Sequence, residues 1–261
     1  MINYLNLNRK SDSMRLTGKG KAKDIYLADN GDIIFEFTDR VTAFDGAKKA
    51  EYPHKGKVCC SLTAYWFRVL EEKGIPTHFK EKISTNRMRV ANLKILPVEV
   101  IWRNYVAGSL WRRFEKGEIK LPDYTEAREG ALIPGGMIEF TTKFEAVDRP
   151  VSTKEILDSG WMTEKELGYI SRITEKINDI MFNHLLRKDI LLADFKIEFG
   201  RAPDGKILLA DEVGTPDGCR FWDRNAFIRG ELLSLDKDVF RKNKGDLSAA
   251  YIAIHNRILK E

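Results

Sequence analysis

Three stretches of the chain carry apolar residues at the spacing of an amphipathic helix. The first spans 56–73 and is followed by a Gly and a Pro, the second begins after Thr163, and the third spans 246–260. Thr163 and Glu166 have the spacing of a capping box. We therefore predict three helices. Their apolar positions are Leu62, Tyr65, Trp66, Val69 and Leu70 in the first, Leu167, Ile170, Ile173, Ile177, Ile180 and Met181 in the second, and Leu247, Tyr251, Ile254 and Ile258 in the third.

Other parts of the chain have the composition of strands. Asn30-Gly31 predicts a hairpin, because this pair favours the tight turn between two strands. Residues 90–102 are apolar but broken by Pro97, which favours a kinked or edge strand at a passage between two lobes. Residues 115–150 lack a clean period, and we expect loops over a site there, with some short elements. The sum is an α+β fold with a strand-rich lobe at 1–95 and a mixed lobe at 96–261.

The stretch 191–200 alternates between apolar and charged residues. Its charged face consists of Asp194, Lys196 and Glu198. The following Asp-Gly pair at 204–205 predicts a two-residue turn, and that register sets Glu198 directly opposite Asp211. Facing carboxylates repel unless a cation separates them, and Mg²⁺ bound to nucleotide phosphates commonly uses one or two carboxylates. An exposed polar face, with Lys196 offsetting two acids, is the alternative.

Two further segments carry arginine beside turn residues. A loop rich in Gly and Pro follows the acidic strands and presents Asp217 and Arg220, and arginine suits capture of phosphate or carboxylate. Arg103 leaves an apolar strand, and Ser109 can cap the next helix, whose first N–H groups would face an anion. Ordinary turns and a capped helix with surface arginines explain the same residues.

A basic loop at 18–23 contains two glycines and alternating lysines. Lys21 and Lys23 could cover phosphates, although the spacing is not that of a Walker A loop. A flexible basic loop is the alternative.

Composition favours a globular protein of the cytoplasm. The 261 residues are 43% hydrophobic and 32% charged, with a net charge of +5. The polar N-terminus does not resemble a secretory signal, and apolar runs are too short to span a membrane, so we expect no membrane association. The three cysteines do not form a CxxC pair, which predicts free thiols. The basic charge fits nucleic acid or small anionic ligands, but acids at the proposed site and the lack of a nucleic-acid motif favour small ligands.

The motifs together resemble the family of phosphoribosylaminoimidazole-succinocarboxamide (SAICAR) synthetases. The segments 95–109 and 192–200 are similar to two family signatures, and the likeness covers 18–251. Further similar blocks are Gly20-Lys21-Ala22-Lys23-Asp24-Ile25-Tyr26, Ala43-Phe44-Asp45-Gly46 and Pro216-Asp217-Gly218-Cys219-Arg220-Phe221-Trp222.

The resemblance implies a ligase of purine biosynthesis. Such an enzyme condenses carboxyaminoimidazole ribonucleotide (CAIR) with L-aspartate and hydrolyses ATP to ADP and phosphate. The implied fold has two α+β lobes with antiparallel sheets around an ATP cleft, and its N-terminal lobe is similar to those of kinases and ATP-grasp proteins. The implied assembly is a homo-oligomer, a dimer or larger.

The resemblance also implies roles for single residues. Lys21 and Lys23 would contact nucleotide phosphates, and Glu198 and Asp211 would hold Mg²⁺. Of the remaining positions, Arg103, Ser109 and Arg220 would bind the ribonucleotide, and Asp194, Lys196 and Asp217 would lie near its reacting end.

The expected chemistry needs charge neutralisation and alignment, and the sequence offers no Ser/His/Asp arrangement for a protein nucleophile. A free carboxylate is a poor acyl donor, and phosphorylation converts it to an acyl phosphate that an amine can attack. We expect Lys196 to stabilise the transferred phosphoryl group together with Mg²⁺, with Asp194 beside it. A small-molecule kinase with the same ATP cleft is the alternative enzyme.

Overall fold

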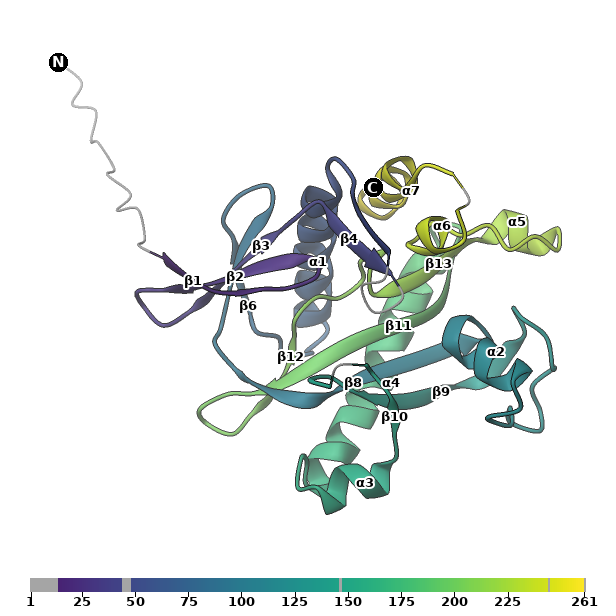
Figure 1. Ribbon diagram of the computed structural model, residues 1–261, viewed down its shortest axis with the longest axis horizontal. Helices are drawn as coiled ribbons and strands as arrows, with labels where there is room; N and C mark the ends of the chain where they lie inside the picture. Colours follow the sequence, from purple (N-terminus) through teal and green to yellow (C-terminus); the bar gives the residue numbers. More distant parts are fainter. Residues whose placement is uncertain (1–13, 44–47, 146, 244, 261) are drawn as a thin grey trace.

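Two antiparallel sheets and three long helices make up the frame of the molecule (Figure 1). The computed structural model describes residues 14–43, 48–145, 147–243 and 245–260. The family-like block at 43–46 therefore lies almost entirely outside the described residues. Within them, no helix is both long and apolar enough to cross a membrane.

The first sheet comes from the N-terminal part of the chain. Its order is β1-β2-β3-β7-β6, with β1 Met14–Lys19, β2 Lys23–Ala28, β3 Ile33–Phe37, β6 Phe79–Lys82 and β7 Arg87–Val90. The predicted hairpin is confirmed, since β2 and β3 pair antiparallel around Gly31, whose φ is 83°. A separate ribbon consists of β4 Arg40–Ala43 and β5 Lys48–Glu51. Helix α1, Lys55–Glu72, packs against β3, β6 and β7.

The second sheet forms the centre of the molecule. Its order is β10-β9-β8-β11-β12, and β13 also pairs with β11; the strands are β8 Lys94–Tyr105, β9 Leu132–Thr142, β10 Pro150–Val151, β11 Ile190–Arg201, β12 Ile207–Ala210 and β13 Cys219–Asp223. Helix α4, Glu164–Leu186, packs against β11 and β8. The apolar residues of β11, Phe195, Ile197 and Phe199, are buried, as the alternation predicts.

The three predicted helices are confirmed as α1, α4 and α7. Helix α4 begins with the Thr163–Glu166 capping box. Helix α7, Leu247–Leu259, buries all four predicted positions and packs against α1. The remaining helices are short: α2 Gly108–Glu115, α3 Thr153–Asp158, α5 Arg224–Ile228 and α6 Asp238–Arg241.

The edge alternative for the strand that contains Pro97 was wrong. Strand β8 pairs with β9 on one side and β11 on the other, so it is central. Pro97 is tolerated there because it lies where the register between β8 and β11 shifts, and a bulge leaves a backbone position unpaired. Residues 115–150 lie mainly in loops and turns, as expected, but they also contain the eleven-residue strand β9, which is longer than the short elements expected there.

The hairpin between β11 and β12 has a three-residue loop where a two-residue turn was predicted. Ala202 N donates to Lys206 O at 2.9 Å, which encloses 203–205, and Gly205 has a φ of 84°. The longer loop shifts the register by one residue, so Glu198 pairs with Ala210 and not with Asp211. Asp211 lies one residue beyond β12 and has a φ of 61°.

Strand β11 changes partner along one edge. Its first half pairs with β13 and its last four residues pair with β12. Between these two pairings the chain leaves the sheet as the loop 211–218, which is tied back where Lys196 N donates to Gly218 O at 2.8 Å. This fork in the sheet edge brings the polar loop against the charged face of β11.

Candidate functional site

A pocket lies at the fork of the sheet edge, between the loop 211–218 and the N-terminal sheet. Its lining brings together most of the residues predicted for the nucleotide and metal. The lining residues are Lys21, Ala22, Val41, Thr42, Lys196, Ile197, Glu198, Asp211, Glu212, Asp217, Gly218 and Lys237. Lys21 is exposed at this pocket, whereas Lys23 is buried beside it.

Glu198 and Asp211 share this pocket despite the shifted register. The left-handed backbone at Asp211 ends the alternation of β12, so its carboxylate is not directed as a continuing strand would direct it. Lys23 Nζ donates to Asp211 at 2.8 Å and to Glu212 at 3.1 Å, and Lys143 forms an ion pair with Glu198. Sequence reasoning missed Lys143, which directly follows β9.

The two carboxylates have opposite pKa shifts. Burial, together with the charge of Asp211, raises the pKa of Glu198 to about 7. Burial also acts on Asp211, but the charges of Lys23 and Lys143 outweigh it and lower the pKa of that carboxyl to about 2. Glu198, Asp211 and Glu212 face only two lysines, Lys23 and Lys143, so the three carboxylates carry one excess negative charge when all are ionised. A divalent cation with oxygen ligands fits such a site.

A cross-strand row of polar residues extends the site over three strands. Glu99 of β8 lies directly opposite Glu198 of β11 and opposite Thr141 of β9. Thr141 donates to Glu99 at 3.2 Å, and Lys196 forms an ion pair with Glu99. The two facing glutamates are 6% exposed each, which rules out a solvent-exposed polar face.

A second cross-strand row lies four residues earlier on β11. Asp194 pairs with Arg103 of β8 on one side and with Arg220 of β13 on the other. Arg103 donates to Asp194 at 3.1 Å and to Ser109 Oγ at 3.0 Å, and it forms an ion pair with Glu139. Ser109 therefore accepts from Arg103 and does not cap α2, whose N-cap is Ala107.

Arginine predominates around this second row. Arg220 donates to Asp194 at 2.7 Å and to Asp238 at 3.1 Å, and Asp238 also accepts from Arg241 at 2.6 Å. Partial burial and the charges of Arg220 and Arg241 lower the pKa of Arg112, a largely exposed residue of α2. The surplus of positive charge suits an anionic group such as a phosphate.

Asp217 is the centre of a buried ion network. It forms ion pairs with Lys55 at the start of α1 and, at 3.6 Å, with Lys237, and it accepts from the Tyr251 hydroxyl at 2.8 Å. Burial raises its pKa, but these cations hold it well below the usual value. Asp217 thus links α1 and α7 to the pocket loop, and sequence reasoning found neither lysine.

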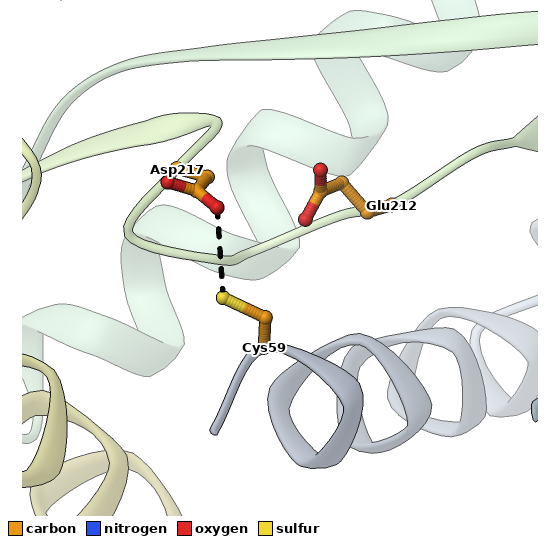
Figure 2. A group of neighbouring side chains, drawn as sticks. All are labelled: Cys59, Glu212 and Asp217. Atoms are coloured by element: carbon orange, nitrogen blue, oxygen red, sulfur yellow. Dashed lines mark hydrogen bonds between the residues drawn. The ribbon is translucent and has the colours of Figure 1, made fainter. Parts of the chain in front are cut away.

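Cys59 lies beside the same loop (Figure 2). Ligand atoms of Cys59, Glu212 and Asp217 lie within 4.8 Å of one another, and the thiol is 3.8 Å from Asp217. Asp217 pairs with Lys55, and Glu212 shares Lys23 with Asp211. Burial raises the pKa of the thiol well above its usual value, and Cys59, Cys60 and Cys219 are free and buried, as predicted.

Comparison with known proteins decides the family. The model of the SAICAR synthetase family matches residues 16–258. The chain belongs to the SAICAR synthetase family. A synthase from Thermococcus kodakarensis is 41% identical over 243 residues, 93% of this chain and 96% of the relative. The fold of the enzyme from Ehrlichia chaffeensis matches with a TM-score of 0.85 at 32% identity, covering 94% of this chain and 98% of that one.

A further SAICAR synthetase structure holds ADP. Its TM-score to this chain is 0.83 at 40% identity, and it covers 95% of this chain and 98% of its own. The α+β family fold and ATP-binding ligase class predicted from the motifs are thereby confirmed. The family assignment favours a ligase over the small-molecule kinase and the nucleic-acid-binding protein.

Proposed function

We propose that the two cross-strand rows are the two halves of one active site. We call them the carboxylate row (Glu198, Glu99 and Thr141) and the arginine row (Arg220, Asp194 and Arg103). As a SAICAR synthetase, the chain joins CAIR to L-aspartate and hydrolyses ATP to ADP and phosphate in purine biosynthesis. The observation that carries the residue assignment is the charged face of β11. Asp194 in the arginine row and Glu198 in the carboxylate row are about 13 Å apart along the strand, with Lys196 midway.

The carboxylate row is the nucleotide half. Glu198 and Asp211 are the residues that would hold Mg²⁺, which when bound would neutralise the phosphates of ATP. Lys21, exposed at the pocket, contacts the nucleotide phosphates. Lys23 acts from beneath by holding Asp211 and Glu212 in place.

The arginine row is the ribonucleotide half. Arg103, Ser109 and Arg220 bind the phosphate of CAIR, and Asp194 keeps the two guanidinium groups aligned. Asp217 lies at the pocket end of the loop, near the reacting carboxylate of CAIR.

Lys196 lies where the two halves meet and acts on the transferred group. The CAIR carboxylate takes the γ-phosphoryl group of ATP, and ADP leaves. The aspartate amine then attacks the acyl carbon, phosphate leaves as the amide bond forms, and the nitrogen loses its proton to solvent. The Lys196 ammonium, held by Glu99, stabilises the negative charge on the phosphoryl oxygens during both steps.

Three broader assignments go with this function. We propose that the enzyme acts in the cytoplasm, that it forms a homodimer, and that its lobes divide near residue 95. The last fits the change of sheet, since β7 ends at Val90 and β8 begins at Lys94.

An ADP-release assay tests the proposal. With ATP, Mg²⁺ and CAIR present, ADP release should depend on aspartate. ADP release at the same rate with and without aspartate would identify a kinase instead.

Glu198→Gln tests the metal assignment. It should lower aspartate-dependent ADP release by at least 100-fold while the melting temperature stays close to wild type, because the amide removes charge but little volume. Asp204→Asn is the control, since Asp204 lies in the exposed loop of the same hairpin. Full activity in Glu198→Gln would disprove the assignment.

A further inference from the structure

The left-handed backbone at Asp211 has to be held in place by neighbouring groups. A non-glycine residue at a φ of 61° is uncommon, and such a residue persists where its surroundings hold it. Its side chain is one of the two proposed metal ligands. The carbonyl oxygen of Asp211 lies 3.3 Å from Nε2 of His78, a residue that the sequence interpretation did not single out.

His78 is buried and enclosed by aromatic rings. The residue is 2% exposed, and its ring centroid lies 5.7 Å from that of Phe35 and 5.4 Å from that of Phe67. These contacts leave the imidazole little freedom to turn away from Asp211. The carbonyl oxygen can only accept, so the ring carries its proton on Nε2.

The backbone of His78 is tied to the strand that delivers Asp211. His78 N donates to Leu209 O at 3.0 Å, and Leu209 N donates to Pro76 O at 3.0 Å. Ala91 N, directly after β7, donates to His78 O at 2.7 Å. The ring, β12 and the end of the first sheet therefore form one bonded unit around the carbonyl of Asp211.

We propose that His78 is a positioning residue for the carboxylate of Asp211. Its Nε2–H fixes the carbonyl of the left-handed residue, which directs the carboxylate into the pocket with Glu198 and Lys23. This inference rests on the proposed function, in which Asp211 holds Mg²⁺. Groups that orient a metal ligand typically change metal affinity or activity by about 10- to 100-fold when removed.

Four variants test the role. His78→Gln keeps an N–H donor near the position of Nε2, His78→Asn is one methylene shorter and cannot reach Asp211, and His78→Leu has no donor. His184→Leu is the matched control, because the ring of His184 bonds Tyr65 and packs on Trp66 instead.

The readout is the Mg²⁺ concentration for half-maximal ADP release at saturating ATP, CAIR and aspartate. His78→Asn and His78→Leu should raise it about tenfold or more, and His78→Gln should stay within about threefold of wild type. His184→Leu should leave it unchanged. A folded His78→Leu or His78→Asn with wild-type Mg²⁺ dependence overturns the inference, and so does equal impairment of Gln and Asn.

A double-mutant cycle separates this inference from the proposed function. In an Asp211→Asn background, His78→Asn should cause no additional loss of thermal stabilisation by Mg²⁺ and ATP, because the carboxylate it positions is absent. An additive loss overturns the inference. If ADP release by the wild-type protein does not depend on aspartate, the proposed function is contradicted instead. The rise in melting temperature on adding Mg²⁺ and ATP still tests the role of His78 in that case.

Discussion

At the scale of single residues, close packing around Arg220 depends on Gly108. Gly108 has a φ of 58° at the start of α2, and a Cβ atom there would lie 2.3 Å from the Arg220 guanidinium carbon. Arg220 cannot move aside without breaking its bonds to Asp194 and Asp238. The helix start and the arginine row are thus a single packing unit.

Gly108→Ala should weaken ribonucleotide binding. We expect the KM for CAIR to rise at least tenfold, because the methyl group displaces Arg220. Gly117→Ala is the matched control, since Gly117 has a φ of 71° with no atom near its Cβ position. Both variants carry similar backbone strain, so steady-state kinetics should separate them. Equal KM values would show that Arg220 does not bind this substrate.

Two of the residues that sequence reasoning missed have partners that depend on strand register. Glu99 and Lys143 reach Glu198 from β8 and from the end of β9. Neither has a local pattern that marks it, because cross-strand neighbours are set by pairing and not by sequence distance. Asp194, Lys196 and Glu198 were found because they alternate within one strand.

At the scale of elements, helical periodicity predicted the long helices correctly, whereas the sequence did not predict how the strands pair. The predicted apolar stripe of α7 is fully buried, and those of α1 and α4 are buried or partly buried against the core. The loop 203–205 has one residue more than the two-residue Asp-Gly turn that was predicted. This extra residue shifts the register of β12 by one position. The carboxylate pair still meets, through the left-handed backbone at Asp211.

The docking of helix α7 gives a prediction for stability. Tyr251 is 1% exposed and donates to the ionised Asp217 at 2.8 Å. A hydrogen bond to a charged group contributes about 1.5–3 kcal/mol, so Tyr251→Phe should lower the free energy of unfolding by that amount in urea titrations. Ser248→Ala, at a half-buried position of the same helix, removes only a 3.4 Å hydrogen bond to Pro53 O and should change it by less than about 0.5 kcal/mol. Equal unfolding midpoints for Tyr251→Phe and wild type would contradict the bond's contribution.

At the scale of the whole molecule, the two sheets share one hydrophobic core. That core runs from Phe35 in the first sheet through Trp66 of α1 to Phe199 in the second and Ile258 of α7. Family signatures distributed along nearly the whole chain were sufficient to predict this fold. They could not show how the lobes join, since the bonds of His78 to β12 and Ala91 combine residues far apart in sequence. The lobe boundary near residue 95 stays a prediction.

Two buried carboxyls set the pH dependence of the ligand-free protein. Burial raises the pKa of Glu198 to about 7, with Asp211 adding to it, and burial with the charge of Asp238 raises that of Asp236 to about 7. A raised carboxyl pKa stabilises the fold at low pH, and this stability is lost as pH rises through the folded pKa. Burial lowers the pKa of His78 to about 4. The stability of the fold therefore rises with pH through this residue, but only below pH 6.5, the usual pKa of histidine.

The melting temperature should therefore fall between pH 6.5 and 8, which covers the last part of the loss. A carboxyl with a folded pKa of about 7 loses about 0.8 kcal/mol of stability over this range, and its larger loss at lower pH is opposed there by His78. Each kcal/mol is worth about 2–4 °C at this chain length. Glu198→Gln should reduce the fall in a thermal unfolding series, leaving the part that belongs to Asp236. Mg²⁺ with ATP should reduce it in wild type as well, because a bound cation favours ionised Glu198. An equal fall in the variant would mean that Glu198 is already ionised at pH 6.5, and the ion pair with Lys143 would then outweigh its burial.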